Sequence, residues 1–221
     1  MSGISQKTPQ LVSLNVGLPR EVVHQGRTVS TGIFKQQVTG PVMLRQMNLD
    51  GDRQADLRVH GGADKAVYLY PFEHYAFWAA ETGRDDFVYG QFGENLTITG
   101  LLEGDVSIGD VFQIGAARVQ VSQPRSPCFK LGIRMGDDGF PARFAAANRT
   151  GFYLRVLEEG MVQAGDAIRR LERAPGSMSV REIFFLRHAG NGTREDYARA
   201  ARLPGLSESW RATFEKRSTE K

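Results

Sequence analysis

The stretch that decides the fold is residues 117–130, which read Ala-Arg-Val-Gln-Val-Ser-Gln-Pro-Arg-Ser-Pro-Cys-Phe-Lys. Its first part alternates apolar and polar residues, which is the pattern of a β-strand. In the second part, Pro124 and Pro127 fix φ and bias the residues before them toward extended backbone, so we expect a stiff, non-helical segment over 123–130. The sequence therefore predicts that Cys128, its only cysteine, is held at the end of a strand.

The neighbours of Cys128 favour a chemical role for its thiol. Arg125 and Lys130 flank it, and cations beside a thiol favour the thiolate, which attacks electrophiles and binds soft metals. The alternative is a small buried apolar residue, which would be inert. Because a core seldom surrounds a small apolar side chain with cations, we predict a functional thiolate.

Length and composition narrow the class of protein. The chain has 221 residues, 41% of them hydrophobic, which is enough for one large domain or one domain with a small appendage. A single cysteine excludes an internal disulfide framework and fits a reducing compartment. No secretory signal and no long apolar run are visible, so we expect a cytoplasmic protein without membrane contact.

Several common kinds of site are missing from the sequence. The 28 Lys and Arg against 25 Asp and Glu leave a net charge of +3, and without an RNP motif or a long basic run we expect no nucleic-acid partner. Neither phosphate-binding glycine fingerprint occurs. The four histidines lack zinc spacing and one cysteine cannot build an iron–sulfur cluster. Any redox chemistry must therefore draw its electrons from elsewhere.

The chain between residues 11 and 172 is dominated by short alternating segments separated by Gly and Asp turns. About ten of them read as strands, which predicts a mainly β fold, a closed or nearly closed β-barrel with short peripheral helices. Helices are expected from Pro71 to residue 78 and over 141–148. The candidate strands are residues 11–16, 27–33, 42–47, 66–70, 94–99, 106–108, 111–114, 117–121, 152–157 and 167–171.

The composition shifts near residues 174–176, where a C-terminal three-helix segment is expected to begin. Ser179 with Glu182 fits a capping box, and Thr193 and Ser207 are candidate starts of two further helices. Such short helices are marginal alone, so they should pack on the barrel or on a partner subunit, which leaves a homodimer open. They carry no ligand constellation, so we expect a stabilising or partner-facing role. The predicted units are a loose N-terminus (1–10), the barrel (11–173) and the helical segment (174–221).

A histidine and two glycines form the first polar motif outside the cysteine segment. Gly61 and Gly62 let backbone N–H groups approach an anion closely, with His60 and Lys65 beside them. An ordinary turn capped by His60 explains the motif equally well. On its own, the motif leaves both interpretations open.

Two further motifs lie on strands. Glu94, Asn95 and Thr97 place carboxylate, amide and hydroxyl groups at the start of a strand, where a plain Asx-type turn is the alternative. Tyr153 and Arg155 share a strand face, where a surface pair is the alternative. Combined with Arg125, Cys128 and Lys130, these groups predict a pocket for an anionic, hydrogen-bonding ligand that ends at a thiolate.

Taken in chain order, the motifs resemble the MOSC family, named for the molybdenum cofactor sulfurase C-terminal domain. The resemblance covers about residues 10–215. The stretch 59–71, the cysteine motif and the three-helix tail are similar to the bacterial YiiM branch. The motifs that carry the resemblance are His60-Gly61-Gly62 with Asp64-Lys65, residues 92–96, Gln123-Pro124-Arg125-Ser126-Pro127-Cys128, and Arg155-Val156 with Glu159-Gly160.

The resemblance implies a β-barrel that binds the molybdenum cofactor, molybdopterin, with Cys128 as metal ligand and catalytic residue. The YiiM branch implies a molybdenum-dependent oxidoreductase that detoxifies N-hydroxylated small molecules, including 6-N-hydroxylaminopurine. The cofactor-binding residues expected on this basis are His60, Gly61, Gly62, Lys65, Glu94, Asn95, Thr97, Arg125, Ser126, Lys130, Tyr153 and Arg155.

The source of electrons and two rival functions stay open at this stage. The helical tail contains no cysteine, so it offers no iron–sulfur domain, and an external flavoprotein-type reductase would have to supply the electrons. The first rival is a carrier of the molybdenum cofactor or of sulfur, using a persulfide on Cys128. The second is a non-catalytic interaction protein with a structural cysteine.

Overall fold

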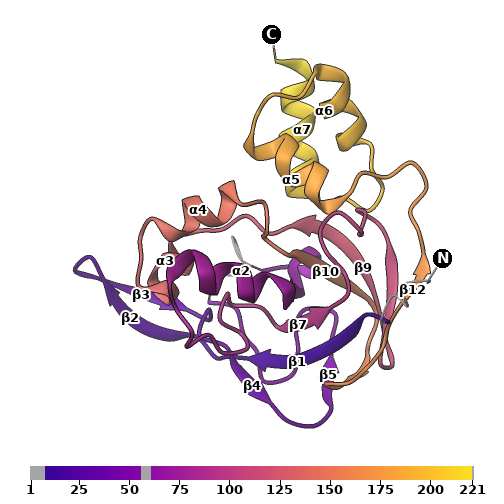
Figure 1. Cartoon of the computed structure of the whole chain (residues 1–221). Helices are drawn as coiled ribbons and strands as arrows, with labels where there is room; N and C mark the ends of the chain where they lie inside the picture. The colour runs from indigo at the N-terminus through magenta and orange to yellow at the C-terminus, as the bar shows by residue number, and fades with distance from the viewer. Residues whose placement is uncertain (1–7, 56–60, 221) are drawn as a thin grey trace, which may run out of the picture.

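The computed structural model describes residues 8–55 and 61–220, a β-rich chain with helices around a large sheet (Figure 1). None of the helices in this part of the chain is long and apolar enough to cross a membrane. The strands are β1 Gln10–Val16, β2 Arg20–His24, β3 Arg27–Thr31, β4 Gln36–Val38, β5 Val42–Leu44, β6 Val67–Pro71, β7 Leu96–Thr99, β8 Val111–Ile114, β9 Ala117–Pro124, β10 Phe152–Glu158, β11 Gly160–Val162 and β12 Ile168–Glu172. The helices are η1 Ala63–Lys65 (a 3-10 turn), α2 Glu73–Thr82, α3 Phe129–Met135, α4 Phe140–Ala146, α5 Val180–His188, α6 Arg194–Ala201 and α7 Glu208–Thr219.

Eight strands form one sheet in the order β12-β8-β9-β10-β6-β7-β1-β4, while β5 pairs with β11 and β2 with β3. All neighbours in the large sheet are antiparallel except β6 and β7. The predicted large set of β-strands with peripheral helices is confirmed as one mixed sheet, but the closed barrel is not, because the sheet has two end strands. The C-terminal half of β1 pairs with β4. Only the start of β1 lies beside the segment before β12, where Gln10 and Ala167 form an isolated bridge. This bridge does not extend into a strand pairing that would close the barrel.

The predicted alternation holds in the strands that carry the cysteine segment. In β9, Val119 and Val121 are buried while Arg118 and Gln120 are half-buried. Two expectations are wrong. Residues 106–108 form no strand, only an isolated bridge from Ser107 to Ser179. The segment over 123–130 is not uniformly a loop, because β9 runs to residue 124 and α3 begins at residue 129. Proline restricts only itself and the residue before it, so a helix can begin soon after residue 127.

Two apolar clusters form the core. The larger one joins the inner face of the sheet to the C-terminal helices, so that Val121 and Phe184 belong to the same cluster. The smaller one is aromatic and packs Tyr70, Trp78 and Phe144 between β6, α2 and α4. Aromatic packing of this kind contributes favourable ring contacts beyond the buried area. This second cluster is next to the pocket described below, because Tyr68 belongs to both.

The predicted C-terminal helical segment is confirmed, and its three helices stand together at one end of the sheet (Figure 1). Capping boxes begin α5 at Ser179 and α6 at Thr193. The sequence predicts the first box and the position of the second helix start. The start of α7 is tied to the sheet, because the Ser207 N–H donates a 3.0 Å hydrogen bond to the Ser122 carbonyl of β9. The helical segment therefore shares both an apolar core and a backbone contact with the strand that leads to Cys128.

We expect Ser179→Ala to lower the free energy of unfolding by about 1 kcal/mol, the usual cost of losing an N-cap. The Ser179 hydroxyl accepts a bond from the Glu182 N–H, and the Glu182 carboxylate accepts one from the Ser179 N–H. Ser207→Ala is the matched control, because the Ser207 side chain makes no capping bond at the start of α7. The measurement is urea unfolding. Equal losses of unfolding free energy for the two variants would contradict the assignment of Ser179 as a stabilising N-cap.

Candidate functional site

One pocket collects most of the predicted site residues. Its walls come from five separate segments of the chain and from Tyr153 of β10; the segments contribute residues 31–33 and 35, residues 52–55, residues 65 and 68, residues 93 and 95, and residues 125, 126, 128 and 130. Segments far apart in the sequence thus meet beside the end of β9. The predicted residues that line it are Lys65, Asn95, Arg125, Ser126, Cys128, Lys130 and Tyr153.

Cys128 is positioned at the junction of an extended segment and a helix. It is the N-cap of α3, with extended backbone at φ −132° and ψ 172°. Its carbonyl accepts a 2.9 Å hydrogen bond from the Leu131 N–H. The thiol is partly exposed and makes no disulfide. A free thiol on a restrained backbone, open to a pocket, can reach a ligand without rearrangement of the fold.

Arg125 places a buried cation beside that thiol. Its guanidinium lies 4.7 Å from the Tyr68 ring and 5.4 Å from the Phe144 ring, and Nη1 donates to the Tyr68 hydroxyl at 3.3 Å. Among the residues that the structure describes, no carboxylate pairs with Arg125. Burial works against its charge, but the influence of Tyr68, Tyr153 and Cys128 outweighs burial and raises the pKa of Arg125. A buried cation without a carboxylate partner favours binding of an anion.

Two tyrosines border Arg125. The rings of Tyr68 and Tyr153 lie 5.3 Å apart, and the Tyr68 hydroxyl donates a 2.7 Å hydrogen bond to the Thr150 carbonyl. Burial raises the pKa of both phenols. They stay protonated at neutral pH, so Tyr153 can donate a hydrogen bond to a bound anion. Tyr68 is absent from the predicted site because its segment reads as an ordinary buried strand.

A buried ion pair forms another wall of the pocket. Lys35 pairs with Asp52, whose carboxylate also accepts hydrogen bonds from the Asn95 side-chain amide at 3.0 Å and the Gly17 N–H at 2.8 Å. Burial lowers the pKa of Lys35, although the Asp52 charge opposes that effect. Sequence reasoning missed both charges, because Asp52 reads as part of a turn and Lys35 has no motif around it. The lining of the pocket therefore combines a thiol, several cations, an amide and a carboxylate.

Glu94 and Thr97 are predicted site residues that do not line the pocket. Both are fully buried, and the Glu94 carboxylate accepts bonds from the Thr97 hydroxyl at 2.9 Å, the Phe92 N–H at 3.0 Å and the Gly90 N–H at 3.1 Å. The Tyr75 hydroxyl also donates to it. Burial raises the pKa of Glu94, against the influence of these bonds. Glu94 holds the turn from which its neighbours reach the pocket.

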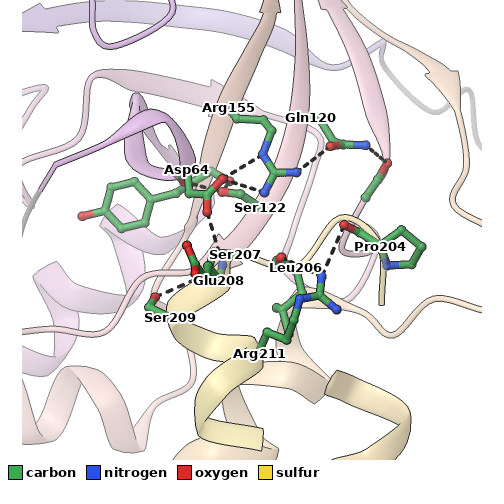
Figure 2. Close-up of polar contacts among 12 residues, drawn as sticks. Asp64, Gln120, Ser122, Arg155, Pro204, Leu206, Ser207, Glu208, Ser209 and Arg211 are labelled. Atoms are coloured by element: carbon green, nitrogen blue, oxygen red, sulfur yellow. Dashed lines mark hydrogen bonds and ion pairs between the residues drawn. The ribbon is translucent and has the colours of Figure 1, made fainter. Parts of the chain in front are cut away.

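Arg155 also does not line the pocket, and Figure 2 shows why. Its Nε and Nη2 atoms donate to the Asp64 carboxylate at 2.9 and 2.6 Å, and Nη1 donates to the Gln120 side chain at 2.9 Å. The Asp64 carbonyl accepts a bond from the Ser122 hydroxyl, and the Asp64 carboxylate lies 3.4 Å from the Glu208 backbone nitrogen at the start of α7. Arg155 thus fastens η1 to the sheet.

The glycine motif sits immediately before η1. Gly62 has φ 96°, a backbone conformation that favours glycine, and its carbonyl accepts a 2.9 Å bond from the Lys65 N–H. Gly61 and Gly62 are half-buried and are not part of the pocket lining. His60 lies outside the described residues. The structure thus brings Lys65 from this motif into the pocket wall.

We expect the pair of Arg155 and Asp64 to show a coupling energy of about 0.5–1 kcal/mol in a double-mutant cycle with alanine, because the two side chains are only partly exposed. The pair of Arg118 and Glu158 is the control, since Glu158 is largely exposed and its coupling should be smaller. The measurement is urea unfolding of the single and double variants. If the losses of unfolding free energy in the Arg155 and Asp64 single variants simply add in the double variant, the contact between the two side chains does not stabilise the fold.

The chain belongs to the MOSC family. The MOSC domain matches residues 56–169, and the YiiM-like, 3-alpha helix domain matches residues 178–217. The "Uncharacterized protein YflK" of Bacillus subtilis is 42% identical, over 97% of this chain and 96% of that protein. These matches confirm the family to which the sequence motifs point.

A solved structure and a longer relative extend the comparison. The crystal structure of YiiM from Geobacillus stearothermophilus matches with a TM-score of 0.81 and 37% identity, covering 96% of this chain and all of that one. A protein named "Reductase" from Gibberella moniliformis is 35% identical over 81% of this chain. This chain covers 32% of that protein. The fold is therefore YiiM-like, and family membership supports an enzyme of the oxidoreductase kind.

Proposed function

We propose that this protein binds the molybdenum cofactor and reduces N-hydroxylated small molecules such as 6-N-hydroxylaminopurine, a detoxifying reaction. The observation that carries the proposal is the buried Arg125 guanidinium beside the Cys128 thiol, with no carboxylate partner among the described residues. Such a place suits a ligand that is anionic and carries a soft metal. Membership of the MOSC family and the relative named "Reductase" support the same class of chemistry.

The donor set of the pocket fits this cofactor. Within residues 8–55 and 61–220, no three His, Cys, Asp or Glu side chains gather to hold a metal ion. A metal bound here would therefore bring most of its ligands with it, as molybdenum does in molybdopterin, and take one soft ligand from Cys128. Arg125 and Lys130 suit the cofactor phosphate. Asn95 and Asp52 offer polar groups that can meet the edge of a pterin.

The overall reaction is R–NHOH + 2 e⁻ + 2 H⁺ → R–NH₂ + H₂O, with electrons from an external flavoprotein-type reductase. When bound, the cofactor supplies two-electron oxygen-atom removal, and the protein supplies position and electrostatics. Cys128 would hold the metal, and the buried Arg125 guanidinium would bind an anionic group of the cofactor. Tyr153, kept protonated by burial, donates a hydrogen bond to an anionic oxygen in the pocket. Each of these residues acts from a strand end or a helix start.

The experiment that tests the proposal is metal and pterin analysis of protein purified from a host able to make the cofactor. It is followed by an assay of 6-N-hydroxylaminopurine reduction with a chemical reductant. Protein from a host unable to make the cofactor is the matched control and should be inactive. Protein without molybdenum or pterin from the competent host would refute the proposal.

A carrier of the cofactor or of sulfur is the second candidate, favoured by the free and partly exposed Cys128 thiol at the pocket. A persulfide on that thiol would be accessible to an acceptor. The same two measurements separate the candidates, since a carrier binds cofactor or sulfur without turning over the hydroxylamine.

A further inference from the structure

A fully buried carboxylate and a fully buried histidine form a polar cluster that does not line the pocket. The Glu103 carboxylate contacts Nε2 of His74 at 3.0 and 2.8 Å and accepts a 2.7 Å hydrogen bond from the Gly151 N–H. Burial opposes the charge of Glu103, but the influence of His74 and the bond from Gly151 outweigh burial and lower the pKa of the carboxyl. At neutral pH the Glu103 side chain is therefore ionised and can only accept hydrogen bonds.

Arg149 determines which nitrogen of His74 carries the proton. Nη1 of Arg149 lies 3.2 Å from Nδ1 of His74, and its guanidinium lies 4.3 Å from the Phe77 ring. A guanidinium can only donate, so Nδ1 of His74 accepts. The ring proton is then on Nε2 and is donated to Glu103. His74 thus links Arg149 to Glu103, with each donor facing an acceptor.

Residues 149–151 connect this cluster to the pocket. The Thr150 carbonyl accepts a 2.7 Å hydrogen bond from the Tyr68 hydroxyl. The Gly151 carbonyl accepts a 3.2 Å bond from the Arg125 N–H. Because Tyr68 and Arg125 both line the pocket, the segment 149–151 bonds to the buried cluster through its own donors and to the pocket wall through its carbonyls.

The Thr150 carbonyl also decides how the Tyr68 hydroxyl can meet Arg125. A hydroxyl has one proton, and Tyr68 donates it to Thr150. The Tyr68 oxygen can therefore accept from Nη1 of Arg125, which lies 3.3 Å away. If the Thr150 carbonyl moved, the Tyr68 proton could turn toward the guanidinium, which has no acceptor to offer.

Gly151 gives the segment little freedom to move. Its φ of +65° favours glycine, and a Cβ at this position would lie 2.4 Å from the Leu69 carbonyl oxygen of β6. The bond to Glu103 satisfies the buried Gly151 N–H. Without Glu103, this N–H would lose its acceptor, which is costly for a buried group.

We propose that Glu103 and His74 are positioning residues for the binding of the anionic cofactor. They hold residues 149–151, and these residues in turn hold Arg125 and Tyr68. The inference rests on the proposed function, because that function assigns the Arg125 guanidinium to an anionic group of the cofactor.

The first experiment needs neither cofactor nor turnover. Hydrogen exchange of backbone amides is measured by NMR on protein from a host unable to make the cofactor. Glu103→Gln keeps the size of the side chain but turns one acceptor into a donor that faces the His74 ring or the Gly151 N–H. We expect the protection factor of the Gly151 amide to fall by about 10- to 150-fold, the equivalent of one charge-assisted bond. The Arg125 amide should lose protection with it, because it bonds to the Gly151 carbonyl.

Asp110→Asn is the matched control. Asp110 is also a fully buried carboxylate that accepts hydrogen bonds from two backbone N–H groups, and it lies outside the pocket lining. Its replacement should destabilise the fold while leaving the contact between Arg125 and Gly151 intact. If the protection of these two amides falls no further in Glu103→Gln than in Asp110→Asn, the proposal is wrong.

Arg149→Met is the second variant, for the case in which Glu103→Gln does not fold. It removes the bond to Nδ1 of His74 and leaves Glu103 in place. We therefore expect a smaller loss of protection at the same two amides. Wild-type protection at both amides in Arg149→Met would then contradict the proposal.

The second experiment compares cofactor binding with turnover in protein from a competent host. Glu103→Gln should retain less pterin after dialysis than Asp110→Asn does, because Arg125 is held less firmly. The rate per bound molybdenum should stay at the wild-type level, because Glu103 does not touch the reacting atoms. A lower rate per molybdenum at full pterin content would contradict a positioning role. Wild-type protein without molybdenum would instead refute the proposed function and leave the exchange result valid.

Discussion

Cys128→Ser should lower the rate of 6-N-hydroxylaminopurine reduction by about 100-fold or more, because losing even a partner that supports a metal ligand costs up to that factor. A thiolate is a strong, soft ligand, whereas a serine hydroxyl is hard and keeps its proton. Serine is nearly the same size as cysteine and is common at helix N-caps. Residue 128 is the N-cap of α3, so the fold and the pocket should survive.

The measurement combines activity, pterin content and thermal unfolding of the same preparation. Wild-type protein from a host unable to make the cofactor sets the background rate. We expect the serine variant to melt close to the wild type, to retain some pterin and to lose nearly all activity. A host that depends on the enzyme should then become sensitive to 6-N-hydroxylaminopurine. Wild-type activity in the serine variant would remove Cys128 from the reaction.

Arg125→Met should weaken binding of the cofactor without lowering the thermal stability of the protein. Methionine fills much of the same space between the Tyr68 and Phe144 rings but carries no charge. Replacing a buried charge with an apolar side chain of similar volume is often neutral or stabilising, so the melting temperature should stay the same or rise. Affinity for the anionic cofactor should fall by about 10- to 150-fold, the equivalent of one charge-assisted bond of about 1.5–3 kcal/mol.

Arg118→Met is the matched control for this experiment. Arg118 lies in β9, the strand that Arg125 directly follows. It pairs with Glu158 and Glu172 at the surface and lies outside the pocket lining. Its loss should leave cofactor content unchanged and cost at most about 1 kcal/mol of stability, as for other exposed pairs. A marked loss of stability in Arg125→Met with unchanged cofactor content would make Arg125 a structural residue.

The sequence by itself determined individual strands and helix starts, because these depend on residues that are close together along the chain. Alternation predicted β9 and β10, and the pairs Ser179 with Glu182 and Thr193 with Asp196 marked the starts of α5 and α6. These features involve contacts within a few positions along the chain, so their signal is local. The position of Cys128, after a strand and beside cations, could be predicted from the sequence because it too depends only on neighbouring residues.

Only the tertiary structure decided which distant side chains share the pocket. The pocket is lined by three residues that belong to no recognisable sequence motif, Lys35, Asp52 and Tyr68. Arg155, which was expected in the pocket, pairs with Asp64 instead. The sequence pattern assigns a residue to a face of a strand, but the partner across that face depends on sheet order and on the packing of helices. The edge of the sheet is also decided by the tertiary structure. The register of strand pairing determines that β1 forms a ladder with β4 and only an isolated bridge near β12. The approach of α5 to Ser126 likewise depends on contacts between residues that are far apart in the sequence.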